Sequence, residues 1–207
     1  MKICLLILLS FIIFFSENCS AQDTIWFLSG ERLITSNYTI KTEDGMLNYF
    51  NKRNKEKHVG LEFVYSVNEK NGNKKVYYES SIMENMPFSV DQMGSFIKGE
   101  YEAHDNYHAT GATVIGILTG AGGVYLSSLV VGTPFYSPVV PAIGSVIVGS
   151  TNKNADKIAE KYPQYANNEY FIMGYQEIAN QKRISNSIKG GILGLVLGVA
   201  SAIIISK

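Results

Sequence analysis

Cysteine is nearly absent from this chain, in which Cys4 and Cys19 are the only two among 207 residues. Both lie near the start, where Lys2 precedes an apolar core over residues 3–15 and small residues follow. This order is typical of a secretory signal, and we expect residues 1–21 to be a signal peptide. The mature chain would then have no cysteine, which excludes disulfides, thiol nucleophiles and cysteine-ligated metals.

The same segment has a rival interpretation as a lipid anchor. Cys19 would carry the lipid, although residues 16–18 match a lipobox poorly. A membrane span is disfavoured at this place, because about thirteen apolar residues are too few to cross a bilayer as a normal helix.

Net charge is also lacking, since 18 basic and 18 acidic side chains cancel. No basic patch with interleaved aromatic residues is present, so nucleic acid is an improbable partner. Catalytic motifs are missing as well: the chain has no G-x-S-x-G elbow, and no lysine follows the glycines of residues 120–123 as a phosphate loop requires. We therefore predict a protein that is not an enzyme and uses no cofactor.

Charged residues are missing throughout residues 106–152, an apolar and glycine-rich stretch. A second apolar tract covers residues 188–205, about 27 Å of helix and close to the thickness of a bilayer core. Small residues recur at every fourth position in both tracts, which predicts a glycine zipper, in which two helices approach backbone to backbone. The predicted packing residues are Ala112, Gly116 and Gly120 in the first tract and Gly190, Gly194, Gly198 and Ala202 in the second. A buried helical hairpin in a soluble protein is the alternative.

The two halves of the mature chain differ in their apolar period. Residues 22–88 contain short segments of strand-like composition between turn signals, and we expect about six strands in a small barrel-like or SH3-like module. From Ser89, whose spacing to Gln92 is that of a helix-capping box, the period is helical. The predicted fold class is therefore α+β, with a glycine-rich helical domain over residues 89–207 that associates with a membrane.

The helical domain repeats itself weakly at a separation of 75 residues. The first copy contains Phe96, Ile97, Gly99, Glu102 and the run Gly116-Ile117-Leu118, and the second contains Phe171, Ile172, Gly174, Glu177 and the run Gly191-Ile192-Leu193. In both copies a polar amphipathic helix leads into a glycine-rich apolar one. The repeat predicts two similar units, related by a pseudo-twofold axis as repeats in membrane proteins often are.

A family resemblance rests on residues 21–25, the turn glycine Gly30 and the Phe96-Ile97-x-Gly99 arrangement before the glycine ladder. In layout the chain resembles small exported proteins of Bacteroidota bacteria, which have a secretion signal ending before glutamine, an SH3-like β module and glycine-rich helices. The resemblance implies this architecture and a location in the cell envelope of a Gram-negative bacterium. It implies no catalytic residue.

One set of side chains has the composition of a metal site. Glu100, His104 and His108 follow one another at four-residue steps, which would put them on one face of a helix. A carboxylate and two imidazoles are able to hold a divalent metal ion. The alternative is a polar helix edge just before the membrane, because no HExxH motif accompanies the three residues.

The sequence leaves two membrane topologies open. If residues 109–150 cross the bilayer twice, residues 151–187 return to the side of the β module. If only the first half crosses, residues 151–187 lie in the cytoplasm, which agrees with the excess of Lys and Arg found on cytoplasmic loops. We favour the double crossing, because residues 139–149 are apolar and need an apolar environment.

These patterns together predict a non-enzymatic envelope protein, anchored in a membrane by its helices, with an extracytoplasmic β module that binds or scaffolds another molecule. Its predicted partners are the lipid bilayer and either a second copy of the chain or another envelope protein. The first alternative is a secreted membrane-active or pore-forming protein. The second is an exported metal-binding protein.

Overall fold

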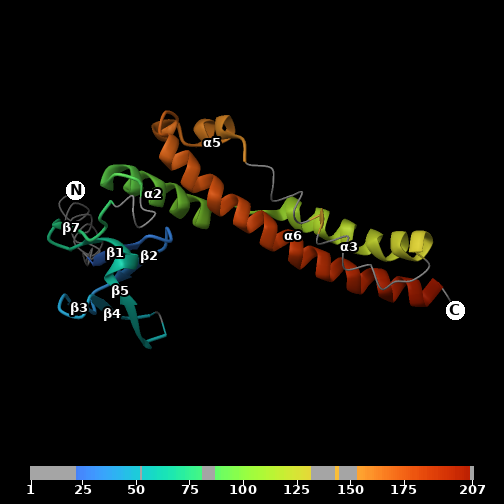
Figure 1. Cartoon of the computed structure of the whole chain (residues 1–207), viewed down its shortest axis with the longest axis horizontal. Helices are drawn as coiled ribbons and strands as arrows, with labels where there is room; N and C mark the ends of the chain where they lie inside the picture. Colours follow the sequence, from blue (N-terminus) through green and yellow to red (C-terminus); the bar gives the residue numbers. More distant parts are fainter. Residues whose placement is uncertain (1–21, 52, 81–86, 132–142, 145–152, 206–207) are drawn as a thin grey trace, which may run out of the picture.

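The computed structural model describes residues 22–51, 53–80, 87–131, 143–144 and 153–205. The expected signal peptide with Cys19, and most of the apolar stretch at residues 139–149, lie outside the described residues. The fold is α+β: a β part occupies one end of the molecule, and helices extend from it to the C-terminus at the other end (Figure 1).

The described part of residues 22–88 forms two antiparallel sheets rather than one barrel. The first has the strand order β2 (Arg32–Thr35), β1 (Asp23–Phe27), β6 (Val64–Asn68) and β7 (Lys74–Val76). The second has the order β3 (Tyr38–Lys41), β4 (Met46–Phe50) and β5 (Glu56–Gly60), and the short helix η1 (Leu61–Phe63) leads into β6. The SH3-like barrel is not confirmed, because no closed barrel forms among the described strands.

A small apolar core holds the two sheets together. Ile25 of β1, Leu47 of β4, and Val64 and Val67 of β6 are almost fully buried in one cluster. Each sheet hides one face in this way, as antiparallel sheets commonly do. A second cluster joins Tyr65 of β6 to helix α2, so the first sheet is packed between the second sheet and the helices.

Helix α2 (Val90–Asn106) begins at the predicted capping box. The Ser89 hydroxyl accepts a hydrogen bond from the Gln92 backbone N–H over 3.3 Å, and the Gln92 side chain accepts one from the Ser89 N–H over 2.8 Å. The capping box is thus confirmed. It satisfies two backbone donors that the first turn of a helix would otherwise leave without a partner.

The longest element is α6 (Glu169–Ile205), and α2 and α3 (Thr110–Val131) both lie along it (Figure 1). Gly99 of α2 faces the backbone near Phe171, whereas Gly120 of α3 faces the backbone near Leu195. Residue numbers therefore rise in the same direction along α2, α3 and α6, so α2 and α3 both run parallel to α6.

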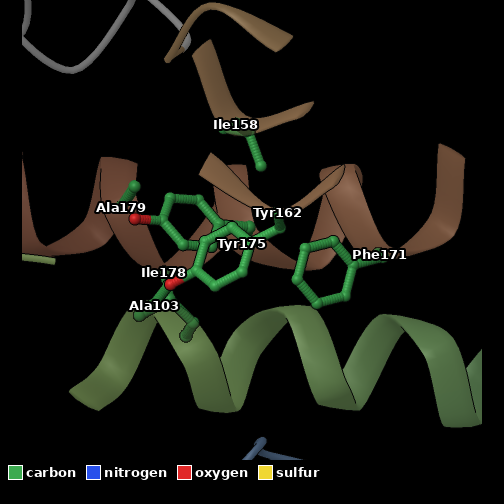
Figure 2. Packing of buried hydrophobic residues seen from close by; sticks show 7 residues of the cluster. All are labelled: Ala103, Ile158, Tyr162, Phe171, Tyr175, Ile178 and Ala179. Carbon is green, nitrogen blue, oxygen red and sulfur yellow. The ribbon is translucent and has the colours of Figure 1, made fainter. Parts of the chain in front are cut away.

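The short helix α5 (Ala155–Lys161) and the turn η3 (Pro163–Tyr165) cover α2 and the first half of α6. Their common core is shown in Figure 2 and consists of Ala103, Ile158, Tyr162, Phe171, Tyr175, Ile178 and Ala179. The stacked rings of Tyr165 and Phe171, 4.2 Å apart, extend it. We refer to α2, α5 and the first half of α6 as the polar bundle.

The sequence repeat corresponds to the packing of the helices on α6. Gly99 faces the backbone of Phe171 while Gly174 faces that of Phe96, so the two copies exchange equivalent contacts at the separation of 75 residues. In the apolar part, however, Gly116 and Gly190 are equivalent, a separation of 74. The difference arises where α2 stops and α3 starts, since residues 107–109 are non-helical while α6 is continuous.

Candidate functional site

The apolar surface of α3 and α6 is the most extensive candidate site. Leu118 on α3 is 66% exposed, and Val196 on α6 is 62% exposed. Further exposed apolar side chains on the two helices are Val114, Ile115, Leu126, Ile188, Ile192, Leu193, Leu197, Val199, Ile203 and Ile204. So many exposed apolar side chains on two neighbouring helices are typical of a surface that meets a membrane or a partner.

The helices that carry most of the exposed apolar side chains carry few charged residues. Helix α3 contains no Asp, Glu, Lys or Arg, and Lys189 is the last such residue within α6. Both helices are long and apolar enough to cross a membrane, by length and composition alone. We call α3 and residues 188–205 of α6 the apolar pair.

The predicted packing glycines lie between the two helices of the apolar pair. A Cβ atom added to Gly116 or Gly120 would overlap a backbone carbonyl oxygen of α6, and one added to Gly190 or Gly194 would overlap a carbonyl oxygen of α3. Gly198 is less tight, with the added Cβ 3.0 Å from the carbonyl oxygen of Ala121. The contact lies within one chain, so this face of α6 is already occupied by α3.

The two predicted packing alanines, Ala112 and Ala202, lie in different environments. Ala112 is buried with Ala109 near the start of α3, beside the half-buried Tyr107. Ala202 is half-buried near the end of α6.

The three predicted metal ligands do not come together. Helix α2 ends at Asn106, so His108 lies beyond the helix that carries Glu100 and His104. Glu100 is 5% exposed, whereas both histidines are exposed. No group of three His, Cys, Asp or Glu side chains able to hold a metal is formed within the part of the chain that the structure describes.

Glu100 instead lies beneath the β1–β2 turn. Gly30 has a φ of 73°, which favours glycine, and a Cβ atom at this position would overlap the Glu100 side chain. One carboxyl oxygen, Oε2, is buried and has no hydrogen-bond partner among the described residues. Burial raises the pKa of the Glu100 carboxyl to about 8, and the negative charge of Glu177 adds to the rise.

A cleft of about 420 Å³ separates the first sheet from α2. Trp26, Tyr65 and Tyr165 supply aromatic surface to it. Its lining includes Ser66 and Asn68, whose Oγ and Oδ1 atoms are buried without a hydrogen-bond partner in the described structure. Aromatic walls with a few polar groups are typical of a surface that binds a small molecule or a peptide side chain.

The joint between α2 and α3 is organised by a lysine that the sequence analysis missed. Lys182 of α6 donates hydrogen bonds to the backbone oxygens of Ala103, His104 and Tyr107 over 3.1, 2.6 and 3.0 Å. It thereby satisfies carbonyls at the end of α2 and opposes the negative end of the helix dipole. The sequence contained no signal for this contact, because it joins Lys182 to backbone oxygens 75 to 79 residues earlier in the chain.

Two open grooves flank this joint. One, of about 360 Å³, is lined with Lys153, Lys157 and Arg183, and the other, of about 450 Å³, with Lys182 and Lys189. No acidic side chain lines either groove in the described part of the chain. Positive charge is thus concentrated where the apolar pair begins.

No family model matches this chain, and neither a curated protein nor a solved structure matches it. The candidate sites therefore rest on their own geometry and composition.

Proposed function

We propose that this protein is a membrane-anchored envelope protein, in which the apolar pair lies in the bilayer and holds the β part and the polar bundle at one surface. The observation that carries the proposal is that exposed apolar side chains are concentrated on α3, which has no charged residue, and on the part of α6 where charged residues end at Lys189. Lipid covers such a surface without leaving large apolar side chains in water.

The dimensions of the apolar pair support this role. Helix α3 has 22 residues, about 33 Å at the rise of an α-helix, and the 18 residues from Ile188 to the end of α6 give about 27 Å. Both lengths are close to the roughly 30 Å of a hydrocarbon core. The close glycine contacts act as a glycine zipper, which suits helix association in lipid, where packing replaces the hydrophobic effect.

The direction of the helices supports the double-crossing topology. Helix α3 ends beside the C-terminal half of α6. Just before α5, however, the backbone carbonyl of Lys153 accepts a hydrogen bond from the Gln176 side chain in the first half of α6. The chain therefore returns to the side of the β part before α5 begins. With an export signal this side is extracytoplasmic, so the Lys and Arg residues of residues 151–187 depart from the excess of positive charge usual on cytoplasmic loops.

The exposed β part would then be the binding or scaffolding element, and the role would be non-enzymatic. The cleft between the first sheet and α2 supports this, since aromatic side chains line it. The first sheet lies at the end of the molecule away from the apolar pair (Figure 1). The partner would be a second copy of the chain or another envelope protein, and it would contact surfaces other than the glycine face of α6.

Cell fractionation tests the proposal. The full chain should remain in the membrane pellet after a carbonate wash, whereas the double variant Leu193→Lys/Leu197→Lys should move to the supernatant or be degraded. Each lysine placed near the middle of a bilayer costs about 3 kcal/mol, which is enough to prevent insertion of a marginal helix.

The matched control is Val90→Lys/Met173→Lys, which changes two exposed apolar residues of the polar bundle and should leave the protein in the pellet. Wild-type protein in the carbonate supernatant would contradict the anchor. If purified wild-type protein dissolved without detergent and released dye from liposomes, the membrane-active alternative would replace it.

A further inference from the structure

We propose that the groove between α3, α5 and α6 binds the phosphate of an anionic phospholipid headgroup, with Lys153, Lys157 and Arg183 as the recognising residues. The inference rests on the proposed membrane anchoring and adds the class of lipid. Three positive side chains from two separate parts of the chain meet here, in a space of about 360 Å³.

The groove has a basic part and an apolar part, which match the headgroup and the acyl chains of a phospholipid. Its basic residues come from the segment around α5 and from α6, while Ala112 and Ile115 line it from the first turns of α3. Ile115 is 46% exposed and belongs to the apolar pair. A phospholipid would place its phosphate against the cations and the start of its acyl chains against α3, because the two parts of the groove lie at the level where headgroup gives way to hydrocarbon.

The described lining of the groove includes no Asp or Glu side chain. Lys182 neutralises the carbonyl end of α2, so that end does not repel an anion. Lys153 is placed by Tyr107, over whose ring its Nζ lies 5.5 Å from the centroid. The nearest acidic residues in sequence, Asp105 and Asp156, do not line the groove.

The second groove adds positive charge on the other side of α3. Lys189 and His108 line it, and Lys189 is the last charged residue before α6 becomes apolar. Basic groups on both sides of one helix at this depth create a positive surface potential, which attracts anionic lipid in preference to zwitterionic lipid. A soluble acidic partner would contact the cations alone, whereas a phospholipid would also use the apolar lining that Ala112 and Ile115 provide.

The test uses the full chain in a non-ionic detergent, so that lipid binding is measured independently of membrane insertion. Short-chain phosphatidylglycerol, short-chain phosphatidylcholine, inorganic phosphate and a polyglutamate peptide are titrated separately by calorimetry. We expect phosphatidylglycerol to bind at least ten-fold more tightly than each of the other three ligands. The variant Lys153→Gln/Lys157→Gln/Arg183→Gln should lose that preference.

The control Lys55→Gln/Lys57→Gln/Lys70→Gln removes the same charge from exposed positions of the β part and should bind like the wild type. The single variant Lys157→Gln, at an exposed position, keeps the test valid if the triple variant does not fold, and it should weaken phosphatidylglycerol binding by about three-fold or more.

Equal binding of the two lipids, or an equal loss in the control, would overturn the inference. Phosphate binding as tight as that of phosphatidylglycerol would assign the groove to a free anion, and tighter polyglutamate binding would assign it to a protein partner; each result also overturns it. Failure of the anchor itself is distinguishable, because it appears as wild-type protein in the carbonate supernatant whatever the titration gives.

Discussion

We expect alanine at Gly120 to drive α3 and α6 apart, whereas alanine at Gly122, two residues along the same helix, leaves them together. A Cβ at Gly120 would overlap the carbonyl oxygen of Gly191, while a Cβ at Gly122 meets nothing within 4 Å. Backbone atoms of two long helices cannot yield locally, so the helices must separate and lose contacts along their length. Overpacking of this kind costs about 1–3 kcal/mol, and more where backbone is involved.

The two substitutions should therefore have opposite signs in one measurement. Gly122→Ala gains helix propensity, up to about 1 kcal/mol, and should raise the midpoint of thermal unfolding slightly. Gly120→Ala, and likewise Gly194→Ala in the facing helix, should lower it by about 4 °C or more, since each kcal/mol shifts the midpoint by roughly 2–4 °C at this chain length. Circular dichroism of the full chain in detergent reports both. Equal shifts for Gly120→Ala and Gly122→Ala would show that the close contact does not form.

The second large effect is a loss of stability with rising pH that is caused by Glu100. Below its ordinary pKa of 4.5 the carboxyl is protonated in both the folded and the unfolded chain, and it contributes no difference. Between pH 4.5 and about 8 the unfolded chain releases the proton while the folded chain keeps it. The free energy of unfolding then falls by up to about 1.4 kcal/mol per pH unit, and above the folded pKa the loss is complete.

Glu100→Gln should remove this dependence, because the amide keeps the shape of the protonated carboxyl but does not ionise. We expect the variant and the wild type to unfold at similar temperatures at pH 4.5, and the variant to unfold about 10 °C higher at pH 9. Glu160→Gln, at an exposed position of α5, is the matched control and should follow the wild type at both pH values. If the wild type and Glu100→Gln fell in parallel from pH 4.5 to 9, the carboxyl would not be held neutral in the fold.

The local elements were largely predictable because short-range signals specify them. The turn at Gly30 and the capping box at Ser89 both follow from residue types at fixed spacings. About six strands were expected and the described residues form seven; β5 has little strand signal of its own, since Glu56–Gly60 is polar and mostly exposed and is a strand through pairing with β4. Residues 61–63 form η1, where the chain passes from the second sheet to the first.

The tertiary arrangement was harder to predict, because several arrangements are compatible with one sequence pattern. Alternation in the β part allowed a closed barrel, yet the strands divide into two sheets around a shared core of Ile25, Leu47 and Val64. Four-residue spacing grouped Glu100, His104 and His108, but the spacing could not reveal that the helix stops at Asn106. The burial of Glu100 depends on the β1–β2 turn, which lies 70 residues away in the chain.

The repeat shows what sequence periodicity does and does not contain. It correctly pairs Gly99 with Gly174 across the α2–α6 contact, since small residues mark close approach in both copies. It pairs Gly116 with Gly191, whereas the structure makes Gly190 the equivalent residue. A register shift of one residue at the α2–α3 joint leaves no trace in the glycine spacing, because neighbouring glycines occupy positions 190 and 191.

The lipid contact of the apolar pair is the central claim, and spin labelling tests it most directly. Cys4→Ser/Cys19→Ser provides a background without cysteine, into which single cysteines are placed at Leu193 on the apolar pair and at Lys57 on β5. After reconstitution of the full chain in liposomes, the account predicts that oxygen relaxes the label at Leu193 strongly while a water-soluble nickel chelate does not, and that Lys57 shows the reverse. Strong relaxation of the Leu193 label by the nickel chelate, equal to that at Lys57, would contradict it.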